Sequence, residues 1–475
     1  MLKEKGGRVN NETRIYTVFL SGGVCVGFDA FQKYHPDIKM MKNQEILERI
    51  KDRCKGVEFV GETEPVKGEK AISNIKEQKG NLDGLLVFGP PSDEIISIGL
   101  PIVAVERPLE GCTSVPFHSY KESKVITSYL PALCDKNPEV YSLRIEDIAR
   151  KIMLIDAISK MKGLRVLVVT DKPILGYFEP MDLQIETSRE EYERIYLSNL
   201  KEIFGAELVV IPQKELFEKT HAMDEEKTKE VAQKWIKGAI ALRGTNENEV
   251  LKSAKLYLAM KELMDKNNCT AITVEGFGWP PLGYDASPSQ GLPTSQFLTD
   301  GIAAASETLT DCLITQQLGL YIIGSAGLLG DYTIDPLNNT CIIAHCEGSL
   351  KPYQDERRSP YAIRNLPFVK ENTGGACIQI HYPIGETVTV AKISMYKKKI
   401  SIFTGETVSG EELFPYWDDV LGRNKIAVKT DAKALLENVD WKTFGNHRVA
   451  LFGDHRQEFK DFAKLIGFKV IEEDK

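Results

Sequence analysis

The chain has 475 residues, enough for two or three domains, because single hydrophobic cores rarely extend beyond about 250–300 residues. Its 60 basic and 68 acidic residues give a formal net charge of −8, which argues against general nucleic-acid binding, since a basic surface is expected there. No segment has the roughly 20 continuous apolar residues of a membrane span, and the start "MLKEKGGRVNNETR" lacks the features of a signal peptide. The 9 scattered cysteines favour reduced thiols. We therefore expect a cytoplasmic protein with neither nucleic acid nor membrane as partner.

Strands that alternate with helices are predicted for the first part of the chain. The segment "RIYTVFLSGG" predicts a strand that ends in glycines, and "NQEILERIKDRC" predicts an amphipathic helix. Short buried strands stopped by Gly or Pro are predicted for "LDGLLVFGPP" and "LPIVAVERP". This alternation is typical of a parallel sheet with helices on both faces.

The alternation begins again near Gly163, with a predicted strand in "GLRVLVVTDKP", a helix in "REEYERIYLSNLKEIFG" and a strand in "AELVVIPQKEL". From about residue 340 the pattern changes to β-branched or alternating runs with Gly-containing turns, as in "TCIIAHCE" and "ETVTVAKISMYKKKISIFTGETV". The predicted fold class is therefore α/β. Two successive doubly wound parallel-sheet domains, 1–162 and 163–338, precede a mostly antiparallel, barrel-like β domain over 339–475.

The Gly-rich loop "LSGGVCVGF" follows the first predicted strand and has some likeness to a phosphate-binding loop. It matches neither the GxGxxG nor the Walker pattern. A tight strand-to-helix turn is the favoured interpretation.

Two carboxylates and two histidines are the candidate site residues. Glu307 follows the run "GIAAAS" and precedes a predicted helix, so Ser306 as N-cap and Glu307 in the first turn is one interpretation. Asp331 follows "YIIGSAGLLG", where an acid at a strand end often only caps the next turn. His345 and His447, from only 7 histidines, each lie at the end of a predicted element and could be core residues. Carboxylate and imidazole together also suit Mn²⁺ or similar ions with open positions.

Several stretches of the chain resemble segments of one known family. They are the helix "ALRGTNENEVLKSAKLYLAMKELM", the strand "TAITVEGF", the segments "LPTSQFLTDGIAAASETLTDCLITQQLG" and "GDYTIDPLNNTCIIAHCE", and the tail "WKTFGNHRVALFGDHRQEFKDFAKLIGFKVIEED". Their order resembles the L-fucose/L-arabinose isomerase family over about residues 160–475, and the tail resembles the fucose type. The N-terminal part is similar only in its alternation of elements.

The resemblance implies a role for each candidate. Glu307 and Asp331 match the acids that bind metal and exchange protons, and His447 matches the metal-binding histidine near the C-terminus. His345 matches a histidine that arabinose-type members use as an additional ligand. The implied cofactor is a divalent metal, with Mn²⁺ the expected ion, and the implied assembly is a homo-oligomer, a trimer or hexamer. The implied partner is a small-molecule sugar.

This chain also departs from the family pattern. Thr294 and Ser306 stand where the family has Cys, and Thr308-Leu309 stands where it has Gly-Asp. The segment Thr299-Asp300-Gly301 replaces a more acidic one. These departures leave the sugar undefined and a diverged activity open.

The implied reaction is aldose–ketose isomerisation of a monosaccharide through a cis-enediol. A divalent ion stabilises the developing enediolate as a Lewis acid, while one carboxylate removes the proton and another acid returns it. Three alternatives stay open. A diverged relative would carry out other sugar chemistry, a non-catalytic sugar-binding protein would need no paired acids, and a glycoside hydrolase would use Glu307 and Asp331 but would leave His447 without a role.

Overall fold

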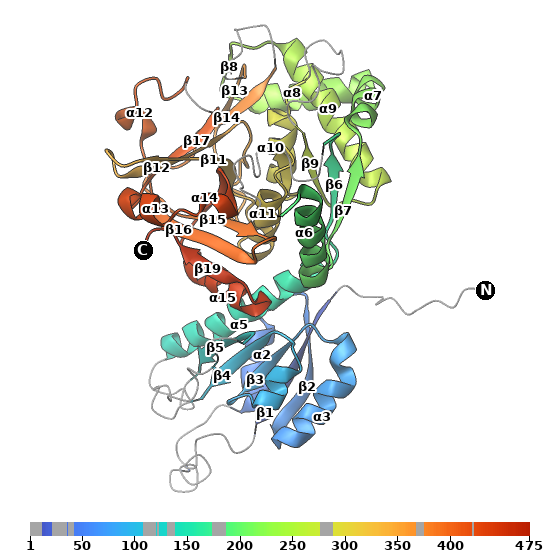
Figure 1. Ribbon diagram of the computed structural model, residues 1–475, viewed down its shortest axis with the longest axis vertical. Helices are drawn as coiled ribbons and strands as arrows, with labels where there is room; N and C mark the ends of the chain where they lie inside the picture. Colours follow the sequence, from blue (N-terminus) through green and yellow to red (C-terminus); the bar gives the residue numbers. More distant parts are fainter. Residues whose placement is uncertain are drawn as a thin grey trace, which may run out of the picture. The chain divides into compact units, whose positions relative to one another are not determined.

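The structure is a computed structural model that describes residues 12–20, 36, 42–107, 120, 123–130, 138–172, 187–275, 288–366, 375–419 and 422–475 (Figure 1). The loop "LSGGVCVGF" lies outside the described residues apart from its first residue, Leu20. The chain divides into two compact units, Met1–Lys160 with Lys460–Phe468 and Met161–Phe459 with Lys469–Lys475. Each unit is described by itself below.

The first unit contains a five-stranded sheet in which every neighbouring pair is parallel. The strand order, β2-β1-β3-β4-β5, is one that occurs in doubly wound α/β folds. The strands are β1 Thr13–Leu20, β2 Val57–Val66, β3 Gly84–Phe88, β4 Ile102–Glu106 and β5 Val125–Tyr129. The helical segments are α2 Asn43–Lys51, α3 Gly68–Gln78, η1 Lys79–Asn81, α4 Asp93–Ser97 and α5 Pro138–Met161.

Burial explains why the short strands of this unit form. Every residue of β3, "GLLVF", and of β4, "IVAVE", is buried, as expected for central parallel strands covered on both faces. The amphipathic helix α3 buries Ala71 and Ile75 in the same hydrophobic cluster as the strand residues Leu85 and Val87.

The second unit begins with a four-stranded parallel sheet in the order β10-β9-β6-β7. Its strands are β6 Arg165–Val169, β7 Glu207–Ile211, β9 Ala271–Val274 and β10 Ala304–Ser306. The helices of this part are α6 Arg189–Phe204, α7 Gln213–His221, α8 Glu225–Gly238, α9 Glu247–Lys266, α10 Gly291–Thr299 and α11 Thr310–Ile322. The long helix α9 begins at the N-cap Asn246, whose side chain accepts hydrogen bonds from two backbone amides.

A seven-stranded, mostly antiparallel sheet follows in the order β15-β18-β11-β12-β17-β16-β19. Because β15 also pairs with β16, six of these strands form a closed ring, and β19 is attached to β16 in parallel. The strands are β11 Leu328–Asp335, β12 Thr340–His345, β15 Thr387–Ser394, β16 Lys399–Val408, β17 Asn424–Lys429, β18 His447–Phe452 and β19 Lys469–Glu472.

The remaining elements of the chain are short. A three-stranded sheet joins β14 Cys377–Ile380, β13 Tyr361–Arg364 and β8 Leu242–Arg243. The last helices are α12 Gly410–Leu413, α13 Ala432–Asn438, α14 Trp441–Phe444 and α15 Arg456–Ile466. The predicted α/β class, with parallel sheets followed by a mostly antiparallel sheet, is confirmed at this level of detail.

Two local predictions are wrong. "YII" of the segment before Asp331 is not part of a strand, because Tyr321 and Ile322 end helix α11. Asp331 is not at a strand end either, since it lies inside β11, which belongs to the antiparallel ring.

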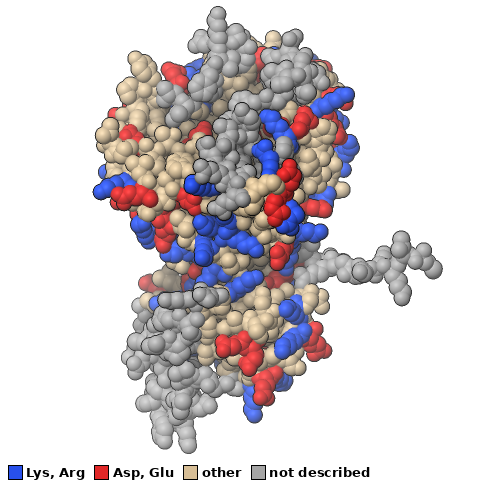
Figure 2. Space-filling view, viewed as in Figure 1, with Lys and Arg blue, Asp and Glu red and all other residues tan. Residues whose placement is uncertain are grey.

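The surface carries charges of both signs. Figure 2 shows Lys and Arg side chains next to Asp and Glu on the described parts of this face, in line with 60 basic and 68 acidic residues in the chain. None of the helices in the described ranges has the length and apolar content needed to cross a bilayer.

Candidate metal centre

Glu307 lies directly after β10, the edge strand of the second parallel sheet. Its backbone φ is 61° and that of Thr308 is 55°, so two consecutive non-glycine residues have the left-handed conformation. This conformation costs about 1–2 kcal/mol per residue, and such strain is concentrated at functional sites. Helix α11 begins only at Thr310, with Leu309 as its N-cap, so the predicted capping by Ser306 is wrong. Glu307 therefore lies in a strained turn between β10 and α11.

His345 ends strand β12 and is oriented by a buried carboxylate. Its Nδ1 lies 2.7 Å from Oε2 of Glu347. The other oxygen of Glu347 accepts hydrogen bonds from the backbone N–H and the hydroxyl of Ser306, at 3.1 and 2.5 Å. The carboxylate of Glu347 therefore links the end of β10 to the imidazole of His345, and leaves Nε2 of His345 facing Glu307.

His447 begins strand β18 and is the direct cross-strand partner of Asp331 on β11. Nε2 of His447 lies 3.4 Å from Oδ1 of Asp331. The same Oδ1 accepts a hydrogen bond of 2.8 Å from the side-chain amide of Asn446. Gly330, which precedes Asp331, permits a close approach to β12, because a Cβ there would lie 2.6 Å from the backbone nitrogen of Ala344.

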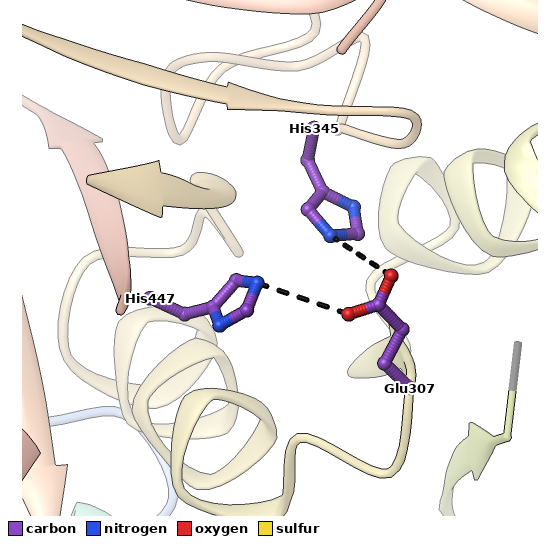
Figure 3. Close-up of side chains that lie close together, drawn as sticks. All are labelled: Glu307, His345 and His447. Carbon is purple, nitrogen blue, oxygen red and sulfur yellow. Dashed lines mark ion pairs between the residues drawn. The ribbon is translucent and has the colours of Figure 1, made fainter. Parts of the chain in front are cut away.

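The carboxylate of Glu307 faces both histidines, with one oxygen toward each ring (Figure 3). Its Oε1 is 3.9 Å from Nε2 of His345, and its Oε2 is 3.9 Å from Nε2 of His447. One ligand atom from each of these three residues lies within 4.8 Å of the other two. Asp331 is not a member of this three-residue group, but it contacts the group through Nε2 of His447.

Burial and the neighbouring carboxylates favour the protonated form of Glu307. Burial raises its pKa to about 7; the charge of His345 opposes this shift, and the carboxylates of Glu347 and Asp331 add to it. The pKa of Asp331 is also raised, chiefly by burial. The two acids therefore hold their protons to a higher pH than isolated carboxyl groups do.

The pKa values of the two histidines are shifted in opposite directions. Burial lowers the pKa of His345, but the charge and hydrogen bond of Glu347 outweigh burial and raise this pKa well above its ordinary value. Burial and the charges of His345, Lys392 and Arg448 hold the pKa of His447 well below its ordinary value. A neutral His447 has a nitrogen lone pair available, which is the form that binds a metal.

This donor set could hold a metal ion. Two imidazole nitrogens and at least one carboxylate suit first-row divalent metals such as Mn²⁺, Fe²⁺ or Zn²⁺. The pairing of His345 with Glu347 is the carboxylate–histidine arrangement that orients metal-binding imidazoles. Burial and the nearby carboxylates of Glu347 and Asp331 raise the pKa of Glu307, and a divalent cation would relieve this electrostatic condition.

The structure thus brings Glu307, His345 and His447 together, with Asp331 beside them. Glu347 was missed in the sequence, although a signal was present. It is two residues from His345, at the end of a β-type run, and such spacing places two side chains on the same side of an extended chain. Ser306, considered only as a cap, is instead a hydrogen-bond donor to Glu347.

Comparison with known proteins adds little to this site. No family model matches the chain, and no curated protein sequence matches it. Among solved structures, a sugar ABC transporter protein from Yersinia enterocolitica subsp. enterocolitica 8081 is 11% identical, with 66% of this chain and 78% of that chain covered and a TM-score of 0.16. The sugar-binding protein of a sugar ABC transporter from Bacillus halodurans is 15% identical (65% and 89% covered, TM-score 0.15). AraP, an arabinose binding protein from Geobacillus stearothermophilus, is 12% identical (65% and 88% covered, TM-score 0.14). These TM-scores are too low to indicate a shared overall fold or function.

Proposed function

We propose that this protein is a metal-dependent aldose–ketose isomerase of the L-fucose/L-arabinose isomerase type, acting on a monosaccharide through a cis-enediol. The observation that carries the proposal is the convergence of two carboxylates on one buried imidazole. Glu307 and Asp331 lie 3.9 and 3.4 Å from the same nitrogen of His447, although the three residues come from separate elements. The family resemblance assigns metal binding to these same three residues.

The residues that would hold the ion are Glu307, Asp331 and His447, with His345 as a further ligand. A bound divalent cation supplies Lewis-acid stabilisation of the negative charge that develops on the sugar oxygens. The neighbouring carboxylates of Asp331 and Glu347 are anionic when deprotonated, so they cannot supply this stabilisation.

Proton transfer is assigned to the two carboxylates. Glu307, with its pKa near 7, can release and accept a proton at neutral pH, which is the property required of a general acid–base group. Asp331 exposes 45% of its side chain, against 16% for Glu307, so the two acids have different environments. Such a difference allows one carboxylate to accept the C–H proton while the other acid returns a proton, with the roles exchanged in the reverse direction.

The test is a panel of aldoses and ketoses incubated with the protein and Mn²⁺ in D₂O. Interconversion and deuterium incorporation at C1 or C2 are read by NMR. We expect at least one aldose–ketose pair to interconvert, with activity abolished by EDTA and restored by Mn²⁺. A metal-loaded protein that binds a sugar but neither interconverts nor deuterates any member would overturn the proposal in favour of non-catalytic sugar binding.

A further inference from the structure

Arg448, the residue after His447, is completely buried and contacts the turn that carries Asn446 and His447. Its Nη1 donates hydrogen bonds to the backbone carbonyls of Phe444, Gly445 and His447, at 3.3, 3.0 and 2.9 Å. Its guanidinium also lies over the ring of Tyr332, 4.9 Å from the centroid. A single side chain therefore donates hydrogen bonds to carbonyl groups on both sides of Asn446.

The opposite side of this guanidinium is held by the C-terminal end of the chain. Nη2 of Arg448 donates a hydrogen bond of 2.9 Å to Oε1 of Glu473, and both side chains are fully buried. Glu473 follows strand β19, and its backbone N–H donates to the carbonyl of Ile402 on β16. The buried ion pair thus connects the last residues of the chain to the Gly445–His447 turn.

The turn carries the contacts that set the positions of Asp331 and His447. The side chain of Asn446 binds Oδ1 of Asp331, and its backbone carbonyl accepts a hydrogen bond of 2.8 Å from the N–H of Tyr332. Gly445 has φ 61° and ψ −158°, a conformation that is essentially restricted to glycine. A shift of this turn would move the carboxylate of Asp331 and the imidazole of His447 together.

His447 has a particular need for such support. A metal-binding histidine normally donates its second ring N–H to an acceptor that fixes the ring. Nδ1 of His345 has the carboxylate of Glu347 at 2.7 Å, whereas Nδ1 of His447 is buried and has no hydrogen-bond partner among the described residues. The position of the His447 ring therefore depends on its backbone, which Arg448 holds through the carbonyl of His447 itself.

We propose that the Arg448–Glu473 pair is a positioning device for the metal centre, through which the C-terminal tail sets the geometry of His447 and Asp331. This inference rests on the proposed function, because it presumes that these residues hold an ion. A buried ion pair by itself is weak support for stability, and apolar residues of similar volume often replace one without loss. Positioning and stability can therefore be separated by experiment.

The separating variant is the double substitution Arg448→Met with Glu473→Leu, which removes both charges and retains apolar volume. Its readouts are the thermal melt of the metal-free protein and the Kd for Mn²⁺ by calorimetry. We expect a folded protein whose Kd for Mn²⁺ is raised about 10–100-fold, the usual effect of removing support from metal ligands. Arg448→Lys is the second variant, because lysine keeps a cation opposite Glu473 but cannot bridge Glu473 and the turn with two nitrogens. We expect the same weakening of Mn²⁺ binding in this variant.

Asp474→Asn is the matched control in the same tail. Asp474 accepts a hydrogen bond of 2.9 Å from Arg456 and one of 3.1 Å from the backbone N–H of Thr404, and neither donor is a site residue. We expect this variant to keep the wild-type Kd for Mn²⁺.

The outcomes separate this inference from the proposed function. A folded double variant or a folded Arg448→Lys variant with the wild-type Kd would overturn the positioning role and leave the metal site in place. Weakened Mn²⁺ binding in these variants, in a protein without isomerase activity, would support the positioning role and overturn the reaction. A wild-type protein that binds no Mn²⁺ would overturn both.

Discussion

Nδ1 of His345 lies 2.7 Å from Oε2 of Glu347, and both side chains are buried. Because Glu347 also accepts two hydrogen bonds from Ser306, its carboxylate is fixed at both oxygens. The imidazole of His345 is therefore oriented with Nε2 toward Glu307, as a metal ligand would be.

Glu347→Gln should weaken metal binding without a substitution at any proposed ligand. The amide keeps the volume of the side chain but carries no charge, so it supports the His345 ring less strongly. We expect the Kd for Mn²⁺, measured by calorimetry, to rise about 10–100-fold. Glu356→Gln is the control, since Glu356 is 85% exposed and pairs only with Lys351 among the described residues. Equal affinity in both variants would show that Glu347 does not support a ligand.

Glu307→Gln should fold and lose nearly all turnover on the sugar that the panel identifies. Glutamine fills the same space but cannot accept the C–H proton, and loss of a positioned acid or base costs about 10²–10⁴-fold. The measurement is kcat, together with deuterium incorporation under metal saturation. The matched control is Glu437→Gln on α13, where the side chain is 65% exposed. Turnover near the wild-type value in Glu307→Gln would remove Glu307 from the chemistry.

Glu307→Gln should also stabilise the metal-free protein at high pH. The pKa of Glu307 is about 7 in the fold against an ordinary value of 4.5, so between these values the folded state binds more protons than the unfolded state. Stability therefore falls as pH rises through this window, and the penalty is complete above pH 7. It amounts to about 3 kcal/mol at pH 8 as an upper limit.

Urea unfolding at pH 5 and pH 8, in EDTA, measures this effect. The free energy of unfolding of Glu307→Gln should exceed that of the wild type by more at pH 8 than at pH 5. Parallel pH profiles for the two proteins would contradict the raised pKa. Saturating Mn²⁺ should reverse the order at pH 8, because the ion binds the deprotonated wild-type carboxylate and stabilises the folded state by mass action.

A homo-oligomer, a trimer or a hexamer, is expected from the family resemblance, with a neighbouring subunit closing the sugar pocket. A closed pocket keeps water from the enediol and limits side reactions. Light scattering over a dilution series, with activity measured on the same samples, tests this expectation. A monomer that stays fully active at nanomolar concentration would show that one chain closes its own site.

Much of the element order follows from the sequence alone. The apolar strands β3 and β4 form where short apolar runs stopped by Gly or Pro predict them, since burying such segments is the main driving force that local sequence encodes. The residue types around Glu307 and His447 also indicated metal chemistry, because carboxylate and imidazole in matching family segments suit one ion.

Only the tertiary structure decided which of these groups meet. The register of β11 on β18 places Asp331 opposite His447, and a register shifted by one residue would turn Asp331 to the other face. The link from Glu347 to Ser306 and the pairing of Arg448 with the tail residue Glu473 join segments that are separate in sequence. Local periodicity carries no information on such contacts, because they depend on how sheets and chain ends pack. Tertiary packing therefore decided which polar residues form the candidate centre.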